Sequence, residues 1–281
     1  MTGTERAAER WEGRSAGELA RGWGIPAVHL FARVGSTNDV ARALAERGAP
    51  AGTAVLAEEQ TAGRGRSGRA WSSPPGLGIW LSMILRPEDL PAPGLLPLRV
   101  GLAAAGALAP FARPGLVQVK WPNDLLIDGR KLGGILCEGS WEAGSPSFVV
   151  VGIGINAWHA PGDFPEEIRP RATSLRIAGG WTPPRAEVAG ALVRAVAALP
   201  ARFPATLDER EMAELERRDS LRGLAVEVRG AADPGLVGTA LGINPEGALL
   251  VRTPEGALRA VHSGTVLPAE GGPPVFRAPP A

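Results

Sequence analysis

An Asp-Gly pair at positions 128 and 129 separates two apolar runs, residues 125–127 and 131–138. Asp-Gly between such runs is a strong hairpin signal, because the favoured two-residue turn needs positive φ at both positions. Another strand is expected at 148–156, after this hairpin. Strands joined by hairpins, in place of regular strand–helix–strand units, favour an α+β fold.

The chain as far as Arg222 is predicted to contain strands, loops and helices in alternation. Apolar runs, capping residues and turn residues predict strands at 27–34, 53–57, 78–85 and 117–120, and helices at 36–47, 97–111, 184–203 and 207–218. Residues 1–24 are expected to form a short helix and a glycine-rich connection, an N-terminal extension to a larger domain at 25–222.

Short strands and repeated turns follow Arg222. The sequence Pro-Glu-Gly-Ala-Leu at 245–249 recurs at 254–258, which indicates a tight meander. Strands are expected at 225–229, 236–243, 248–252 and 257–261. We therefore predict a small β-barrel domain at 223–270, and a loose, proline-rich tail at 271–281.

The composition excludes several classes of function. A net charge of +1 gives no reason to expect nucleic acid or an acidic membrane as a partner. The N-terminus has no apolar signal core, and no run approaches the ~20 apolar residues of a membrane span. Cys137 is the only cysteine, which fits a reducing compartment. We expect a cytoplasmic protein, and, because the three histidines lack metal-ligand spacing, no protein-bound metal site.

The loop at 63–71 holds three arginines among glycines spaced as G-x-G-x-x-G. A dinucleotide-binding loop would lead into a helix, which Pro74 and Pro75 prevent here. A phosphate-binding P-loop would place lysine after Gly68, where Arg69 stands. The loop is then either a lid that grips an anion or a solvated surface loop. Ordering nine residues costs about 9–18 kcal/mol, so a lid should be mobile until a ligand with phosphate and apolar contacts binds.

Three other segments bear on the choice between lid and surface loop. Residues 35–39, Gly-Ser-Thr-Asn-Asp, open a helix, for which a simple N-cap is the alternative explanation. Residues 120–124, Lys-Trp-Pro-Asn-Asp, end a strand, and Lys131 follows in the hairpin, where it could also be an exposed lysine. Gly152 and Gly154 share one face of a strand, so that either a flat ligand or a helix can approach closely.

Together and in this order, these segments resemble the catalytic domain of bacterial biotin–protein ligases. The family motifs G-S-T-N, G-R-G-R-x-G-R-x-W, K-W-P-N-D, R-K-x-x-G-I-L and G-I-G-I-N all occur between residues 35 and 156. The resemblance implies a mixed β-sheet packed by helices, related to the lipoyl ligases, with an SH3-like C-terminal barrel. It also implies an activity: ATP activates biotin to biotinyl-5′-AMP, and biotin then passes to a lysine of a biotin carboxyl carrier protein domain.

The resemblance further implies a role for each motif residue. The ureido end of biotin would be held by Ser36, Thr37 and Gln60, with Asn38 beside them. The implied catalytic residues are Arg64 and Arg66, which with Gly65 would close over biotin and the adenylate phosphate, and Lys131, which would contact the carboxylate and the α-phosphate. The implied binding set also includes Trp71 in the pocket wall, Asn123 and Asn156 near the nucleotide, Gly134 and Gly154.

The implied chemistry brings two anions together, the carboxylate of biotin and the α-phosphate of ATP. The arginines, Lys131 and Mg²⁺ can neutralise that repulsion. Asp124 is either a magnesium ligand or an ordinary turn aspartate. No enzyme nucleophile is needed, which agrees with a structural role for Cys137.

One departure and three alternatives remain. The family often carries an acid and an arginine in the C-terminal barrel, whereas residues 263–268 here read Ser-Gly-Thr-Val-Leu-Pro, which puts a C-terminal contribution to ATP binding in doubt.

The alternatives are a lipoyl or octanoyl ligase, a biotin-binding module without catalysis, and a biotin-responsive DNA-binding repressor. Only 34 residues precede Gly35, too few for a helix-turn-helix domain before the first strand, so no operator binding is expected. A homodimer is left open.

Overall fold

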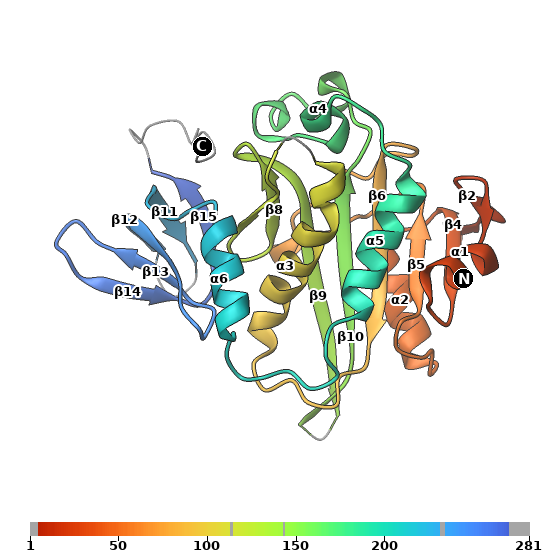
Figure 1. Cartoon of the computed structure of the whole chain (residues 1–281), viewed down its shortest axis with the longest axis horizontal. Coiled ribbons are helices and arrows are strands. Elements are labelled where there is room, and N and C mark those ends of the chain that lie inside the picture. The colour runs from red at the N-terminus through yellow and green to blue at the C-terminus, as the bar shows by residue number, and fades with distance from the viewer. Residues whose placement is uncertain (1–4, 113–114, 143, 231–233, 270–281) are drawn as a thin grey trace.

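The structure, a computed structural model, describes residues 5–112, 115–142, 144–230 and 234–269. An eight-stranded sheet in the order β1-β4-β5-β6-β10-β9-β8-β7 forms the larger part of it (Figure 1). All neighbours are antiparallel except β4 and β5, so the expected mixed sheet of an α+β fold is confirmed. The strands are β1 (Arg6–Ala7), β4 (Val28–Arg33), β5 (Ala54–Ala57), β6 (Gly78–Leu85), β7 (Gln118–Lys120), β8 (Asp124–Ile127), β9 (Arg130–Glu142) and β10 (Ser145–Asn156).

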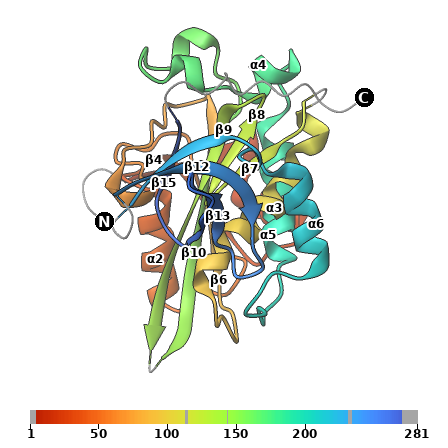
Figure 2. The same ribbon diagram turned by 90° about the vertical axis from the view of Figure 1, so that its left-hand side faces the viewer.

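The predicted Asp-Gly hairpin is present between β8 and β9. Asp128 and Gly129 take φ values of 49° and 71°, and Ile127 pairs with Arg130 across the turn. A second, longer hairpin joins β9 to β10 and extends beyond the helices (Figure 2). The two hairpins place the motif strands β8, β9 and β10 side by side in the sheet.

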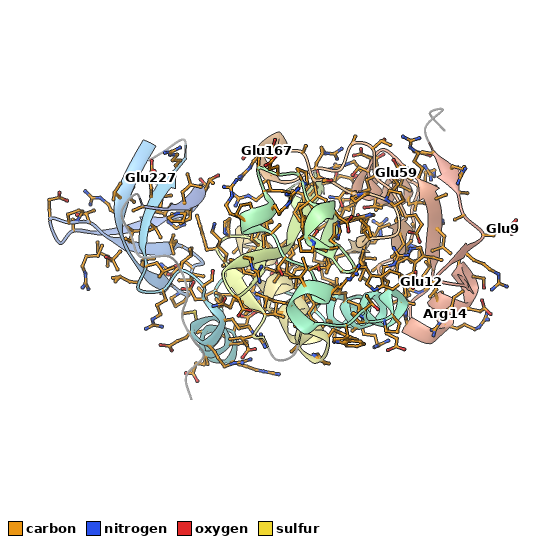
Figure 3. All side chains as sticks on the ribbon, turned by 90° about the horizontal axis from the view of Figure 1, so that it is seen from above. Glu9, Glu12, Arg14, Glu59, Glu167 and Glu227 are labelled. Carbon is orange, nitrogen blue, oxygen red and sulfur yellow. The ribbon has the colours of Figure 1, made fainter. Side chains whose placement is uncertain are left out.

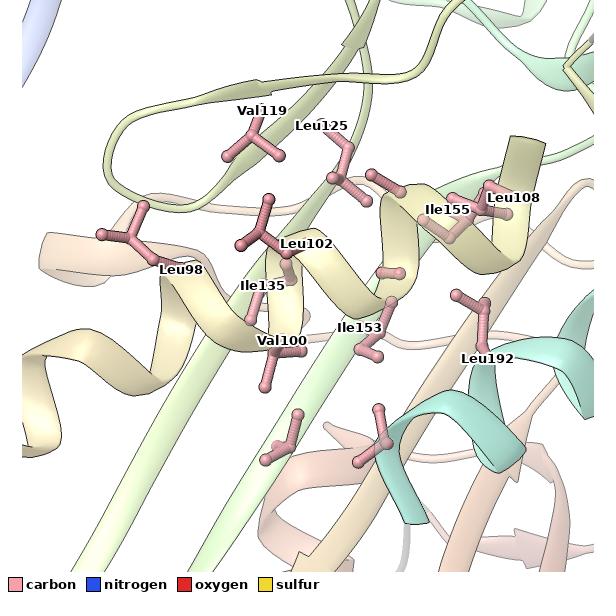
Figure 4. Packing of buried hydrophobic residues seen from close by; sticks show 14 of the residues in the cluster. Leu98, Val100, Leu102, Leu108, Val119, Leu125, Ile135, Ile153, Ile155 and Leu192 are labelled. Carbon is pink, nitrogen blue, oxygen red and sulfur yellow. The ribbon is translucent and has the colours of Figure 1, made fainter. Parts of the chain in front are cut away.

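Helices cover both faces of this sheet (Figures 1 and 2). The main core lies under α1, α3 and α5, and a smaller core lies under α2 on the other face. In Figure 4, Val100 and Leu102 of α3 lie near Ile135 of β9 and Ile153 of β10. The helices are α1 (Ala16–Trp23), α2 (Thr37–Glu46), α3 (Leu96–Leu108), α4 (Leu175–Gly179), α5 (Arg185–Ala197) and α6 (Glu209–Arg218).

Two helices differ from expectation in ways that burial and proline explain. The stretch Pro93–Phe111, which contains α3, is by length and mean hydropathy (1.4) able to cross a membrane, although no such run was expected from the sequence. Half of the most apolar part of this stretch is buried in the structure, so packing against the sheet accounts for its apolar character. The helix expected at 184–203 ends at Ala197, because Pro200 disfavours helical backbone at the residue before it.

The C-terminal residues form a separate five-stranded antiparallel sheet, in the order β14-β13-β12-β11-β15, that fits an SH3-like fold. The strands are β11 (Ala225–Arg229), β12 (Pro234–Ile243), β13 (Leu249–Arg252), β14 (Leu258–Val261) and β15 (Thr265–Pro268). Four were predicted; β15 was missed because its pairing with the distant β11 leaves no hairpin signal in the sequence. The predicted tail at 271–281 lies outside the described residues.

One strand of the N-terminal segment, β1, joins the edge of the larger sheet. Its helix α1 was expected, but β1, β2 (Arg10–Trp11) and β3 (Arg14–Ser15) were not. β1 pairs with β4, and Glu12 binds Arg185 at the start of α5. Figure 3 shows Glu12 at the opposite end of the molecule from Glu227 of β11. The segment closes the end of the sheet that lies away from the C-terminal domain.

Candidate active site

A cavity of about 460 Å³ lies on the α2 side of the sheet. Its volume is in the range of small-molecule sites, about 300–1,000 Å³. The start of α2, the loop at 63–72, strands β6, β9 and β10, the turn before β8, the segment 156–172 and β15 all contribute to its wall. All thirteen residues of the implied binding set line it: Ser36, Thr37, Asn38, Gln60, Arg64, Gly65, Arg66, Trp71, Asn123, Lys131, Gly134, Gly154 and Asn156. Their individual roles remain predictions.

One end of the cavity is a neutral, hydrogen-bonded group at the start of α2. Thr37 donates to Gln60 Oε1 from its backbone nitrogen at 2.9 Å and from its hydroxyl at 3.0 Å. Gln60 Nε2 in turn donates to Ser73 Oγ at 2.8 Å. Ser36 is the N-cap residue but makes no side-chain capping bond, so the simple N-cap explanation for this serine is wrong. These bonds hold a polar surface in a defined orientation without introducing charge.

Asn38 is held on both sides. Its Oδ1 accepts from Ser82 at 2.6 Å, and its Nδ2 donates to Glu138 at 2.7 Å. A Cβ at position 152 would lie 2.3 Å from Asn38 Oδ1, so only glycine fits there. Gly152 therefore allows helix α2 to pack closely on β10, which is one of the two alternatives that the sequence left open.

The loop 63–71 is folded over the cavity. Trp71 donates from its backbone to Gly63 at 2.8 Å, and Gly65 to Arg69 at 2.7 Å. A Cβ on Gly63 would lie 2.5 Å from the Trp71 carbonyl oxygen, so this close turn requires glycine. Arg64 pairs with Asp39 of α2 through two hydrogen bonds of 2.6 and 2.8 Å. These bonds outweigh desolvation and lower the pKa of Asp39 while raising that of Arg64.

The other end of the cavity is strongly cationic. Besides Arg64, which pairs with Asp39 of α2 at the first end, five cationic residues line the cavity, Arg66, Arg69, Lys120, Lys131 and Arg171, with two acids, Asp124 and Asp163. Burial lowers the pKa of Lys120, and its neighbours Lys131, Arg69 and Arg171 add to the effect. Burial and the charge of Arg69 likewise lower the pKa of Arg66. An excess of cations held this close together is the arrangement expected for an anion with several charges.

Lys131 lies where the two ends meet. Its Nζ is 2.6 Å from Asp124 Oδ1 and 5.0 Å from the centre of the Trp71 ring, a cation–π contact. Trp71 lies against β10 because Gly154 has no side chain: a Cβ there would be 2.7 Å from the indole Nε1. Gly154 therefore determines how closely the tryptophan approaches the sheet.

Asn123 and Asn156 line the cavity and connect parts of its wall. Asn123 Nδ2 donates to the Ile135 carbonyl at 2.6 Å, and Asn156 Nδ2 donates to the Thr173 carbonyl at 3.0 Å. Both amides connect segments that are distant in sequence. Their side-chain nitrogens are thus engaged by backbone carbonyls of the protein.

Several cavity residues were not found from the sequence. Lys120 stands in the K-W-P-N-D motif, and its position at the end of a strand was the available signal. Arg171 had no such signal: it ends a short 3-10 helix, Arg169–Arg171, that belongs to none of the motifs. Residues 264–268 line the cavity, and Arg69 Nη2 donates to Thr265 Oγ1 at 3.1 Å. The C-terminal domain thus contributes to the wall of the cavity, whereas the contribution that its sequence puts in doubt is one to ATP binding.

Two titratable side chains, His159 in the cavity wall and Cys137 in β9, carry no charge at pH 7. His159 stacks on Phe164, with ring centres 4.9 Å apart, and burial lowers its pKa to about 4. The imidazole is therefore neutral at pH 7. Desolvation raises the pKa of Cys137 to about 12, so this thiol stays protonated and is a poor nucleophile.

Comparison with known proteins gives consistent matches along the chain. The model of the Biotin/lipoate A/B protein ligase family matches residues 30–156, and that of the biotin protein ligase C-terminal domain matches residues 223–267. The bifunctional ligase/repressor BirA of Bacillus subtilis is 37% identical over 235 residues, 82% of this chain and 70% of that protein. The biotin–[acetyl-CoA-carboxylase] ligase of Mycobacterium tuberculosis is 36% identical over 256 residues, 89% and 92% of the two chains.

Solved structures agree with the sequence matches. The biotin protein ligase from Aquifex aeolicus in complex with biotin and ATP superposes with a TM-score of 0.69 at 29% identity, covering 85% of this chain and 97% of that one. The biotin protein ligase from Leishmania major in complex with biotinyl-5-AMP has a TM-score of 0.57 at 30% identity, covering 83% and 98%.

Proposed function

This chain belongs to the biotin protein ligase family and is a biotin–protein ligase, and we propose that its cavity joins biotin to ATP and transfers biotin to a lysine of a carboxyl carrier protein domain. The observation that carries the proposal is the meeting of a neutral polar end and a cationic end at Lys131. A neutral ureido group suits the first end, and a carboxylate and a triphosphate suit the second. A cytoplasmic location is part of the proposal.

The first step is the attack of the biotin carboxylate on the α-phosphate, with pyrophosphate as the leaving group. Ser36, Thr37 and Gln60 would hold the ureido group, which points the carboxylate towards Lys131. Lys131 and Arg66 then neutralise the two anions and the charge that develops on the phosphate. Lys120 and Arg171 would bind the remaining phosphates, because both lie in the same cationic wall.

Magnesium is implied by the use of ATP, and the cavity fits it. Mg²⁺ is usually held by one or two carboxylates together with substrate phosphates, not by a full set of protein ligands. Asp124 provides a carboxylate in the cavity, and no group of three or more His, Cys, Asp or Glu residues that could hold a metal occurs among the described residues. We propose that Asp124 would hold the ion, which supplies further neutralisation of phosphate charge.

The second step is the attack of the acceptor lysine amine on the acyl carbon, which forms the amide and releases AMP. The mixed anhydride would be hydrolysed in open water. Loop 63–71 covers the cavity and excludes water from it during this interval. No side chain of the enzyme needs to form a covalent bond, in agreement with the raised pKa of Cys137.

A transfer assay tests this function. The purified chain, ATP, magnesium and labelled biotin are incubated with a biotin carboxyl carrier domain, and in parallel lipoate is offered with a lipoyl domain. We expect label on the biotin acceptor and none on its variant that lacks the target lysine. Transfer of lipoate without transfer of biotin would assign the lipoyl ligase reaction instead.

The fit of Trp71 against Gly154 gives a quantitative expectation. Gly154→Ala adds a methyl group 2.7 Å from the indole nitrogen, and relieving such overpacking costs ~1–3 kcal/mol. The KM for biotin should therefore rise by about one order of magnitude in steady-state adenylation assays. Gly162→Ala, where nothing lies within 4 Å of the added Cβ, is the matched control and should leave the KM unchanged.

A further inference from the structure

We propose that Asp39 is a positioning residue: it holds Arg64, and with Arg64 the loop 63–71, in the closed position over the cavity. The two hydrogen bonds of 2.6 and 2.8 Å between these side chains carry the proposal. What the closed loop covers rests on the proposed function. The pairing itself is a property of the chain with or without substrate.

The start of α2 differs from those of two other helices in a way that releases Asp39 for this role. In α1 and α6, the N-cap side chain and the acid three residues later, Glu18 or Glu211, close on each other as a capping box. In α2 these positions are Ser36 and Asp39, and Ser36 makes no capping bond. Asp39 instead extends to Arg64, a residue 25 positions away. The helix gives up a local stabilisation in favour of a contact with the loop.

The contact with Asp39 sets Arg64 apart from the other two arginines of the loop. Among the described ion pairs, Arg64 is the one arginine of the loop that has carboxylate partners. Glu138 lies 3.7 Å from the same guanidinium and is itself held by Asn38. The bidentate geometry with Asp39 fixes the orientation of the guanidinium as well as its position. Arg64 is thus anchored on α2 at the edge of the cavity that it lines.

Opening the loop must break this pair, so its loss should increase the open population of the empty protein. Both side chains are partly exposed, 35% for Arg64 and 54% for Asp39. Partly exposed ion pairs are modest in strength, and we expect a two- to fivefold change, about the limit for such pairs. Asp39 touches none of the reacting groups in the proposed mechanism, so it should affect loop closure more than the chemical step.

Trypsin measures loop opening directly, because its cleavage sites at Arg64, Arg66 and Arg69 lie in the loop. When opening is fast relative to cleavage, the nicking rate reports the open population. The Asp39→Asn variant, empty, should be nicked in the loop two to five times faster than the wild type. Asp39→Glu should restore slow nicking. Glu216→Gln, which breaks the ion pair between Glu216 of α6 and Arg222 beyond the end of that helix, is the control and should behave as wild type.

A second measurement separates positioning from general destabilisation. With biotin and ATP present, the Asp39→Asn variant should raise the KM for biotin and the rate of biotinyl-adenylate release by the same two- to fivefold factor, with kcat for adenylation changed little. Unchanged loop nicking in Asp39→Asn, or equal acceleration in Glu216→Gln, would overturn the proposal. If the wild type transfers no biotin, the proposed function fails while the nicking comparison still decides the role of Asp39.

Discussion

Replacing Lys131 with alanine should reduce the rate of biotinyl-adenylate formation by about 10²–10³-fold, the usual cost of losing one group that stabilises developing charge. The lysine lies between Asp124 and Trp71, where the neutral and cationic ends of the cavity meet. Without its ammonium group, the carboxylate of biotin and the α-phosphate would approach with less neutralisation. Arg66 acts on the same charges, so Arg66→Ala should cause a loss of the same order.

Pyrophosphate release with biotin and ATP measures this step apart from transfer to the acceptor. The Arg259→Ala variant removes an exposed cation on β14 and serves as the control for net charge. Thermal unfolding should be nearly unchanged in the Lys131 variant, because the side chain is partly exposed. Wild-type rates in both Lys131→Ala and Arg66→Ala would remove the roles assigned to these residues.

The second large effect is on stability. Arg185→Met should lower the free energy of unfolding by about 3–5 kcal/mol, as expected when one partner of a buried ion pair is removed. Arg185 is 3% exposed and donates to Glu12, Glu58 and the Gly78 carbonyl oxygen. Its guanidinium also lies 5.1 Å from the Trp11 ring. The methionine would leave two partly buried carboxylates, 19% and 26% exposed, without their cation.

Urea denaturation with linear extrapolation measures this change. The triple variant Arg185→Met, Glu12→Gln, Glu58→Gln should be more stable than the single variant, because it removes the unpaired charges as well. Arg202→Met breaks an exposed pair with Glu88 and should cost less than about 1 kcal/mol. Equal losses in Arg185→Met and Arg202→Met would show that the buried network contributes little. Glu58 also accepts from the Gly76 nitrogen, so this network supports the chain just after the loop.

Much of the site could be located from the sequence because its motifs are continuous. Each motif lies in a turn, a strand end or a helix start whose backbone is determined by neighbouring residues. Gly63 and Gly154 are examples: both are glycine because a Cβ would collide with Trp71. Their spacing in the sequence already indicated a close approach. The spacing did not indicate which group approaches each glycine. In the structure, helix α2 approaches Gly152 and Trp71 approaches Gly154.

The contacts that organise the cavity could not be predicted, because they join residues far apart in the chain. Arg171 reaches the cationic wall near the end of segment 157–172, whose two 3-10 helices have three residues each and are too short for a periodic pattern. β15 becomes a strand through pairing with β11, and it then brings Thr265 to Arg69 across 196 positions. The mobility expected for the empty loop remains a prediction that the trypsin experiment addresses.

The sequence by itself determined the local conformations: the Asp128-Gly129 turn, the glycines at close approaches and the order of the motif segments. Such features depend on φ, side-chain size and alternation, which act between neighbours. Only the tertiary structure decided the partners, such as Asp39 for Arg64 and Glu12 for Arg185. A charged side chain has many compatible partners, and the choice among them follows from where the sheet and its helices place each residue.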